Sequence, residues 1–207
     1  MRGKMGNYTI IAEAGNALVR LLRRELVPDI IRNSAAIGLA SPADRGDISL
    51  CVHLYDVSES EIYRISGMIP EGADSQRFPP VHLSLSYLIT AFSSSDVKFR
   101  SEEEQRILGR VTQILRDHPV LDLDTMEFGM EGGEDRLRIE MLKADMEEKL
   151  KVWSFPDLYP RLSLFYRMDP LALESARTRN IKRVQEMEFQ RDVTAKPWDK
   201  LFRKIRS

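Results

Sequence analysis

The chain has almost no cysteine, and it lacks the short motifs that mark common catalytic and nucleotide-binding sites. Cys51 is the single cysteine among 207 residues, so an internal disulfide is excluded. Because it lies in an apolar strand pattern, we interpret it as a small buried side chain. No HExxH or CxxC metal spacing, no GxxxxGK or GxGxxG phosphate loop and no GxSxG nucleophile turn occurs. The sequence therefore predicts no cofactor, no metal site and no redox chemistry.

Long uninterrupted hydrophobic runs are also missing. Arg2 and Lys4 precede an apolar stretch near the N-terminus, but Glu13, Asn16 and Arg20 interrupt it before it reaches the length of a signal sequence or a membrane span. We therefore expect synthesis and folding in the cytoplasm, with no insertion into a membrane. With 43% hydrophobic and 30% charged residues, the composition is that of a globular protein with one main core.

Charge is unevenly distributed along the chain. Residues 172–207 hold ten Lys or Arg against five Asp or Glu, a local net charge of +5. The remaining 21 basic and 27 acidic residues give −6 for residues 1–171. We therefore predict two parts, an α+β domain over residues 1–171 and a basic C-terminal arm over residues 172–207.

Helical spacing of apolar residues predicts two long helices. Residues 8–26 place apolar side chains on one stripe, and Pro28 discourages continuation. Residues 101–117 show a second stripe, with Ser101 and Glu104 in the spacing of a capping box and the His118-Pro119 pair at the end. Residues 146–153 predict a shorter helix.

Alternating apolar and polar residues predict four strands. Residues 47–57 and 81–90 alternate most clearly, and Pro79-Pro80 marks the entry of the second of these strands. Residues 135–142 and 160–173 alternate in the same way, and residues 33–47 read as a short strand or extended piece followed by a turn. Residues 58–80 are interpreted as a polar connection.

This order of helices and strands predicts the fold class. It points to an α+β domain in which helices pack on a mostly antiparallel or mixed sheet. No internal repeat of fixed period is present.

Three histidines and an acidic segment are the candidates for chemistry. His53 and His82 lie on two strands and would meet if those strands were neighbours, whereas His118 suits a helix C-terminus. Packed polar histidines are commoner than ligands, so we favour the structural interpretation. Residues 121–135 are similar to a calcium loop, but Glu127 stands where the sixth loop position needs glycine and Met126 where the fifth needs an oxygen ligand.

The C-terminal arm is the predicted partner-binding element. Its segment 181–189 favours an edge strand, and residues 197–205 favour a short amphipathic helix. Its basic residues alternate with acidic ones, which favours a protein partner over nucleic acid. Aromatic and arginine side chains dominate interface energetics, so we predict that the anchors include Trp198, Leu201, Phe202 and Arg203.

Several segments together resemble a known family. They are "LVRLLRREL", "ISLCVHLYDV", "PPVHLSLSYLITAF", "EEQRILGRVTQILRDHPVL" and "PRLSLFYRMDPLAL", in that order within residues 8–171. The chain is similar to the tail cap or terminator proteins of phage-tail-like extracellular contractile injection systems. The motifs are scaffold signatures, so the resemblance implies no catalytic residues.

The resemblance implies a structural function. It implies a subunit that forms a ring, expected to be hexameric, which closes the distal end of the inner tube and the contractile sheath and becomes part of a particle that can be released. An assembly chaperone or adaptor that holds tube or sheath subunits without entering the particle is an open alternative. A small hydrolase or transferase that uses His53 or His82 is a third class.

Overall fold

A computed structural model describes residues 8–60, 67–71, 74–121 and 137–180. A six-stranded sheet forms the centre of the molecule, in the order β1-β2-β5-β8-β7-β6. Its first pair, β1 and β2, is parallel, and every other pair is antiparallel. In sheet order the strands are β1 (Ile37–Leu39), β2 (Leu50–Glu59), β5 (Val81–Ala91), β8 (Ser163–Leu173), β7 (Leu137–Met141) and β6 (Val120–Leu121).

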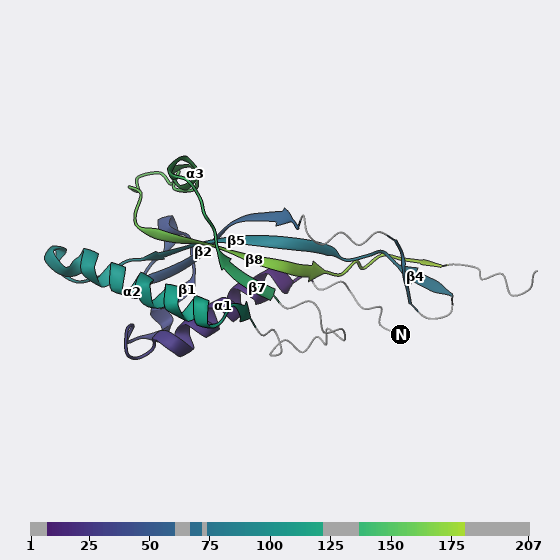
Figure 1. Ribbon diagram of the computed structural model, residues 1–207, viewed down its shortest axis with the longest axis horizontal. Helices are drawn as coiled ribbons and strands as arrows, with labels where there is room; N and C mark the ends of the chain where they lie inside the picture. The colour runs from purple at the N-terminus through teal and green to yellow at the C-terminus, as the bar shows by residue number, and fades with distance from the viewer. Residues whose placement is uncertain (1–7, 61–66, 72–73, 122–136, 181–207) are drawn as a thin grey trace, which may run out of the picture.

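Two long helices cover one face of this sheet (Figure 1). Helix α1 (Ile10–Leu26) and helix α2 (Val97–Asp117) bury their apolar stripes against side chains that β2, β5 and β8 present on the same face. Helix α3 (Met146–Val152) lies on the opposite side, where a smaller cluster joins Leu88, Trp153 and Phe165. The α+β class predicted from the sequence is therefore confirmed, with a mixed sheet.

The central strands extend beyond the helices (Figure 1). A second sheet of three short strands, in the order β3-β4-β9, lies at this extended end. Its strands are β3 (Ile69–Pro70), β4 (Ser75–Arg77) and β9 (Thr178–Asn180). Arg177 stacks over the Phe78 ring at 4.5 Å, and Arg77 pairs with Glu174 at 2.8 Å. These contacts join the segment before β5 to the segment after β8.

The interpretation of residues 58–80 as a connection without strands is wrong. Ser58 and Glu59 complete β2, and β3 and β4 follow within the same stretch. These strands have two or three residues, too few to show an alternating pattern, and they depend on β9, which is distant in sequence. Two short 3-10 turns, Ser34–Ala36 and Pro42–Asp44, flank β1.

The predicted start of the second helix is also wrong. Helix α2 begins at Val97 after Asp96, so Ser101 lies inside the helix and forms no capping box. Glu104 does not cap the helix. Its carboxylate accepts a hydrogen bond from the Ser93 amide at 3.1 Å and forms an ion pair with Arg161 at 2.8 Å. Its carboxylate joins the end of β5 to the segment before β8.

The alternation predicted for the strands agrees with the structure except near the strand ends. Leu85, Tyr87 and Ile89 of β5 point toward the long helices, as their spacing predicts. Leu162 lies in the range predicted as the last strand, but it precedes β8 and is 61% exposed. Strand β8 runs to Leu173, two residues past the expected boundary at 171.

Candidate partner-binding surfaces

The predicted anchors of the C-terminal arm cannot be placed on the fold. Trp198, Leu201, Phe202 and Arg203 lie outside the described residues, as does the predicted strand at 181–189. The candidate binding surfaces are therefore those of the described residues.

The two strand histidines do not form a joint site. Strands β2 and β5 are neighbours, but their register pairs His53 with Leu88, whereas the His82 carbonyl accepts from the Ser60 amide at 2.8 Å. The histidines are thus separated along the strands. His53 packs edge-on against Phe155 at 5.6 Å, and burial lowers its pKa. His118 ends α2, as predicted.

Neither Cys51 nor a carboxylate cluster suggests chemistry in the described part of the chain. Cys51 is fully buried, and this burial raises the pKa of its thiol to about 11, so the thiolate is disfavoured. No group of three or more His, Cys, Asp or Glu side chains gathers there in a metal-binding arrangement. None of the described helices has the length and apolar character to cross a membrane.

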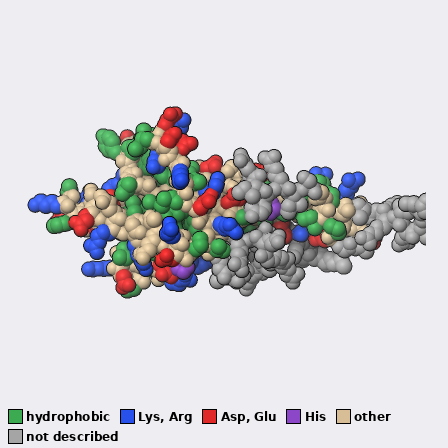
Figure 2. Space-filling model, in the orientation of Figure 1, with side chains coloured by type: hydrophobic (Ala, Val, Ile, Leu, Met, Phe, Trp, Pro, Cys, Tyr) green, Lys and Arg blue, Asp and Glu red, His purple; other side chains and the backbone are tan. Residues whose placement is uncertain are grey.

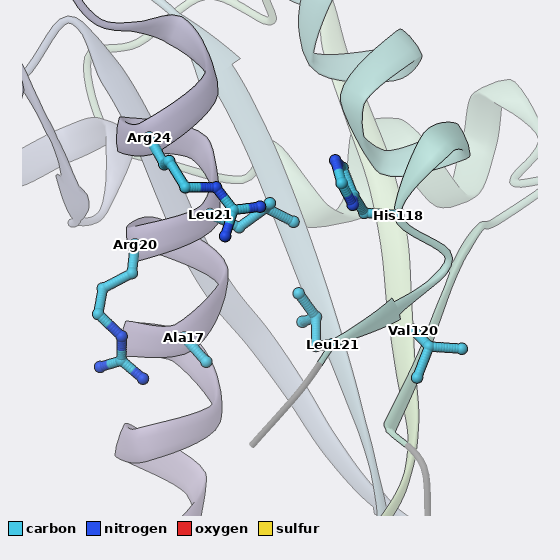
Figure 3. Close-up of a pocket in the computed structure, with 7 residues that line it drawn as sticks. All are labelled: Ala17, Arg20, Leu21, Arg24, His118, Val120 and Leu121. Atoms are coloured by element: carbon cyan, nitrogen blue, oxygen red, sulfur yellow. The ribbon is translucent and has the colours of Figure 1, made fainter. Parts of the chain in front are cut away.

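A groove lies between α1 and the turn that joins α2 to β6 (Figure 3). Its volume is about 360 Å³. Ala17, Leu21 and Leu121 form an almost fully buried floor, and Val120 beside them is 37% exposed. Arg20, Arg24 and His118 complete the lining. We call this the α1–β6 groove.

A second groove, of about 470 Å³, lies at the edge of the large sheet between α1 and β1. Tyr8 and Leu39 line it and remain 76% and 42% exposed. Helix α1 approaches the sheet closely here because residue 15 is glycine. A Cβ at Gly15 would lie 3.2 Å from Leu39 and 3.2 Å from the Tyr87 hydroxyl.

The outer edge of β2 is open along its second half. Strand β1 pairs with β2 only from Leu50 to Val52, and Asp56–Glu59 are exposed. Because the Ser60 amide points toward β5, the alternation of the ladder directs the backbone groups of Val57 and Glu59 away from it. Within the described ranges no strand pairs with that side of these residues. Such an edge offers hydrogen bonds to a strand from another chain.

Exposed apolar side chains also occur at the end that carries α2 and α3. Figure 2 shows hydrophobic side chains there, interspersed with charged ones. They include Val97, Phe99, Met146, Tyr159 and Leu162, each at least 60% exposed. The described residues thus present an open edge along the second half of β2, the two grooves above and several scattered exposed apolar side chains.

Comparison with known proteins identifies the family. The family model described as the Pvc16 N-terminal domain matches residues 13–186, which is most of the chain. The chain belongs to the Pvc16 N-terminal domain family. No curated protein matches it.

Two solved structures share the fold. One is the PVC sheath/tube terminator of an extracellular contractile injection system in its extended state, with a TM-score of 0.63 and 20% identity over 89% of this chain. The other is the anti-feeding prophage cap, a tube terminating cap, with a TM-score of 0.59 and 23% identity over 84% of this chain. The alignments cover 64% and 59% of those chains, so this chain spans less than two thirds of either.

The resemblance inferred from the sequence segments is therefore confirmed. The matched range of the family model, residues 13–186, includes almost all of the range 8–171 that carried the resemblance. It also extends through β9 and past the expected boundary of the arm. Both similar structures are terminators of tubes or sheaths.

Proposed function

We propose that this chain is a structural terminator subunit whose copies form a ring, expected to contain six, at the distal end of an inner tube and its contractile sheath. The family match over residues 13–186 carries the proposal. The described structure supports it, because the strand histidines are separated and the surface offers an open strand edge and grooves for other polypeptides. In this proposal the chain is not an enzyme.

A ring explains how a terminator stops growth. Tube and sheath subunits that stack through heterologous contacts have no intrinsic end, so each layer offers a surface for the next. In a closed ring, the lateral surfaces of each subunit contact the neighbouring copies, and one face of the ring contacts the last layer of tube or sheath subunits. If the opposite face does not repeat the tube or sheath surface, addition stops.

The open β2 edge and the C-terminal arm supply a mechanism for joining neighbours. Main-chain hydrogen bonds to Val57 and Glu59 would hold an added strand, and alternate side chains would select the partner. Residues 172–180 of the predicted arm belong to β8, β9 and the segment between them, so on this proposal the remainder of 172–207 reaches a neighbour, with Trp198, Leu201, Phe202 and Arg203 as its anchors. The bound arm becomes part of the particle together with tube and sheath subunits.

Purified particles test this function. We expect the chain to be present in stoichiometric amount and to be located at one end by cryo-EM, as a ring of this fold. If purified particles lack the chain, and deleting the chain prevents particles from forming, the results would instead support an assembly chaperone. A deletion that leaves particles with capped tubes of normal length would contradict the proposal.

A further inference from the structure

The second groove, between α1 and β1, contains a buried hydroxyl group without a partner. We call it the α1–β1 groove. Tyr87 lines it and is 1% exposed, and within the described ranges its hydroxyl has no hydrogen-bond partner. Buried tyrosine hydroxyls usually have one. A group that enters the groove from another polypeptide would supply the missing hydrogen bond.

The walls of the α1–β1 groove are accessible from solvent. Tyr8 and Leu39 are 76% and 42% exposed, and Ala12 is exposed as well. The Leu39 side chain lies beside the Tyr87 hydroxyl, because both are 3.2 Å from the place that a Cβ on Gly15 would occupy. An exposed leucine can change its rotamer, and rotation of Leu39 would open a path to the hydroxyl.

The lining of the α1–β1 groove favours an uncharged occupant. None of the described residues that line it is Asp, Glu, Lys or Arg. A charged group buried there would lose its hydration without gaining an ion pair. An apolar side chain with one polar tip would instead pack on the walls and reach the hydroxyl. Tyrosine has this form, and it is enriched at protein interfaces for the same reason.

The edge of β1 adds open main-chain groups beside the groove. The Ala36 carbonyl and the Ala40 amide form hydrogen bonds toward β2, at 2.8 and 3.3 Å. The alternation of the strand therefore directs the Leu39 amide and carbonyl away from β2. Within the described part of the chain no strand pairs with that side of β1. Open main-chain groups favour a polypeptide as the occupant.

Tyr159 has the side chain that the groove requires. Among the large apolar side chains that the described residues expose, only Tyr8 and Tyr159 end in a hydroxyl, and Tyr8 already lines the groove. Tyr159 is 89% exposed. Pro160 restricts its backbone to extended conformations, and the next residue, Arg161, forms an ion pair with Glu104 at 2.8 Å. The loop is thus anchored next to an exposed aromatic ring.

We propose that Tyr159 of one copy inserts into the α1–β1 groove of the next copy in the ring and forms a hydrogen bond with the Tyr87 hydroxyl of that copy. Tyr159 follows α3, which lies on the other side of the sheet from α1 (Figure 1). The contact therefore joins two different surfaces, as the head-to-tail contacts of a closed ring do. The inference rests on the proposed function for the ring itself and identifies one contact within it.

The size of this contact makes it one part of a larger interface. A tyrosine side chain buries about 150–250 Å², whereas a standard interface buries about 800 Å² on each partner. Insertion of Tyr159 therefore orients neighbouring copies and contributes to their affinity, but it does not hold the ring alone. For this reason the test is made on the assembled full chain.

Photo-crosslinking detects the contact directly. Tyr159 is replaced by p-benzoyl-phenylalanine, which forms a covalent bond with C–H groups that it touches under irradiation. We expect mass spectrometry to find bonds to peptides that contain residues 8–15 or 39–41, and a mixture of isotope-labelled and unlabelled chains shows that they join two copies. The matched control carries the same amino acid at Phe99, an aromatic position of α2 that is 60% exposed, and should not modify those peptides.

Four variants examine the groove and the hydrogen bond. Ala12→Trp fills the groove from its exposed wall and should lower the cross-linked fraction at least about tenfold. Gln105→Trp, at an exposed position of α2 outside the groove, is its control and should leave that fraction unchanged. Tyr159→Phe and Tyr87→Phe should each raise the concentration needed for half-assembly about fivefold, and the double variant should raise it no further. Circular dichroism checks each fold, and Tyr159→Phe changes only an exposed side chain.

Three results would overturn the proposal. They are no cross-link from Tyr159 to the groove peptides, equal cross-linking of those peptides from Phe99, and an equal loss in Gln105→Trp. Rings seen by cryo-EM without the cross-link would overturn this contact alone and leave the proposed function standing. A chain that stays monomeric and forms no cross-link would overturn both.

Discussion

Two buried tyrosines that lie side by side on neighbouring strands should respond in opposite ways to replacement by phenylalanine. Tyr87 of β5 and Tyr166 of β8 are paired in the strand register, and both are at least 97% buried under the long helices. The Tyr166 hydroxyl hydrogen-bonds with the Thr112 side chain. Among the described residues the Tyr87 hydroxyl has no hydrogen-bond partner, and burial raises the pKa of this phenol.

The magnitudes follow from this difference. A buried hydroxyl without a partner costs about 1–3 kcal/mol in proteins, so Tyr87→Phe should raise the free energy of unfolding by about 1 kcal/mol or leave it unchanged. Tyr166→Phe removes a hydrogen bond and leaves the Thr112 hydroxyl with the Leu108 carbonyl only, so it should lower that free energy by about 1 kcal/mol. Neither change creates a large cavity.

Urea unfolding followed by circular dichroism measures both variants. With a slope of about 1–3 kcal/mol per M, a change of 1 kcal/mol moves the midpoint by roughly 0.3–1 M. We expect the midpoint of Tyr87→Phe to equal or exceed that of the wild type and that of Tyr166→Phe to fall, with unchanged slopes. A fall of the same size for Tyr87→Phe would refute the reasoning, because its hydroxyl would then have a stabilising partner.

Three further predictions concern Cys51, His53 and the C-terminal arm. The rise of the Cys51 pKa from 9.0 to about 11 lowers its thiolate fraction about a hundredfold. Ellman's reagent at pH 8 should therefore label the folded chain at least about a hundredfold more slowly than the chain in urea. Equal labelling rates would contradict this prediction, because they would mean that the thiol is accessible in the folded chain. Burial lowers the pKa of His53 below its ordinary 6.5, so the unfolded chain binds the proton first and stability should fall as the pH drops below 6.5. His53→Gln should reduce that fall in urea midpoints measured from pH 7.5 to 5.5, and an identical pH dependence would contradict the assignment. Deleting residues 181–207, after β9, should leave the unfolding midpoint nearly unchanged but weaken ring formation in light scattering, whereas a truncated chain that does not fold would show that the arm belongs to the core.

The sequence predicted the parts of the fold that have a strong local signal. Helix α1 and strands β2, β5 and β8 carry apolar residues at the spacing of their structure, and α1 ends before Pro28 as expected. The first turn of α2 was missed because Ser101 and Glu104 have the spacing of a capping box. Glu104 instead pairs with Arg161, a residue 57 positions later, and no local pattern reveals such a contact.

The surfaces were less predictable than the core. The α1–β6 groove needs Arg20 and Arg24 on one element and Val120 on another, and only the tertiary fold brings them together. Its sequence signal was weak, since exposed arginines on a helix are usual. The separation of His53 and His82 likewise depends on strand register, which the alternation of each strand does not determine.

Cryo-EM of the purified full-length chain, alone and mixed with the tube and sheath subunits of its own particle, tests the central claim most directly. The account predicts closed rings of this fold that cap one end of the tube and limit its length. A chain that stays monomeric at high concentration and leaves the tube ends bare and still growing would contradict it.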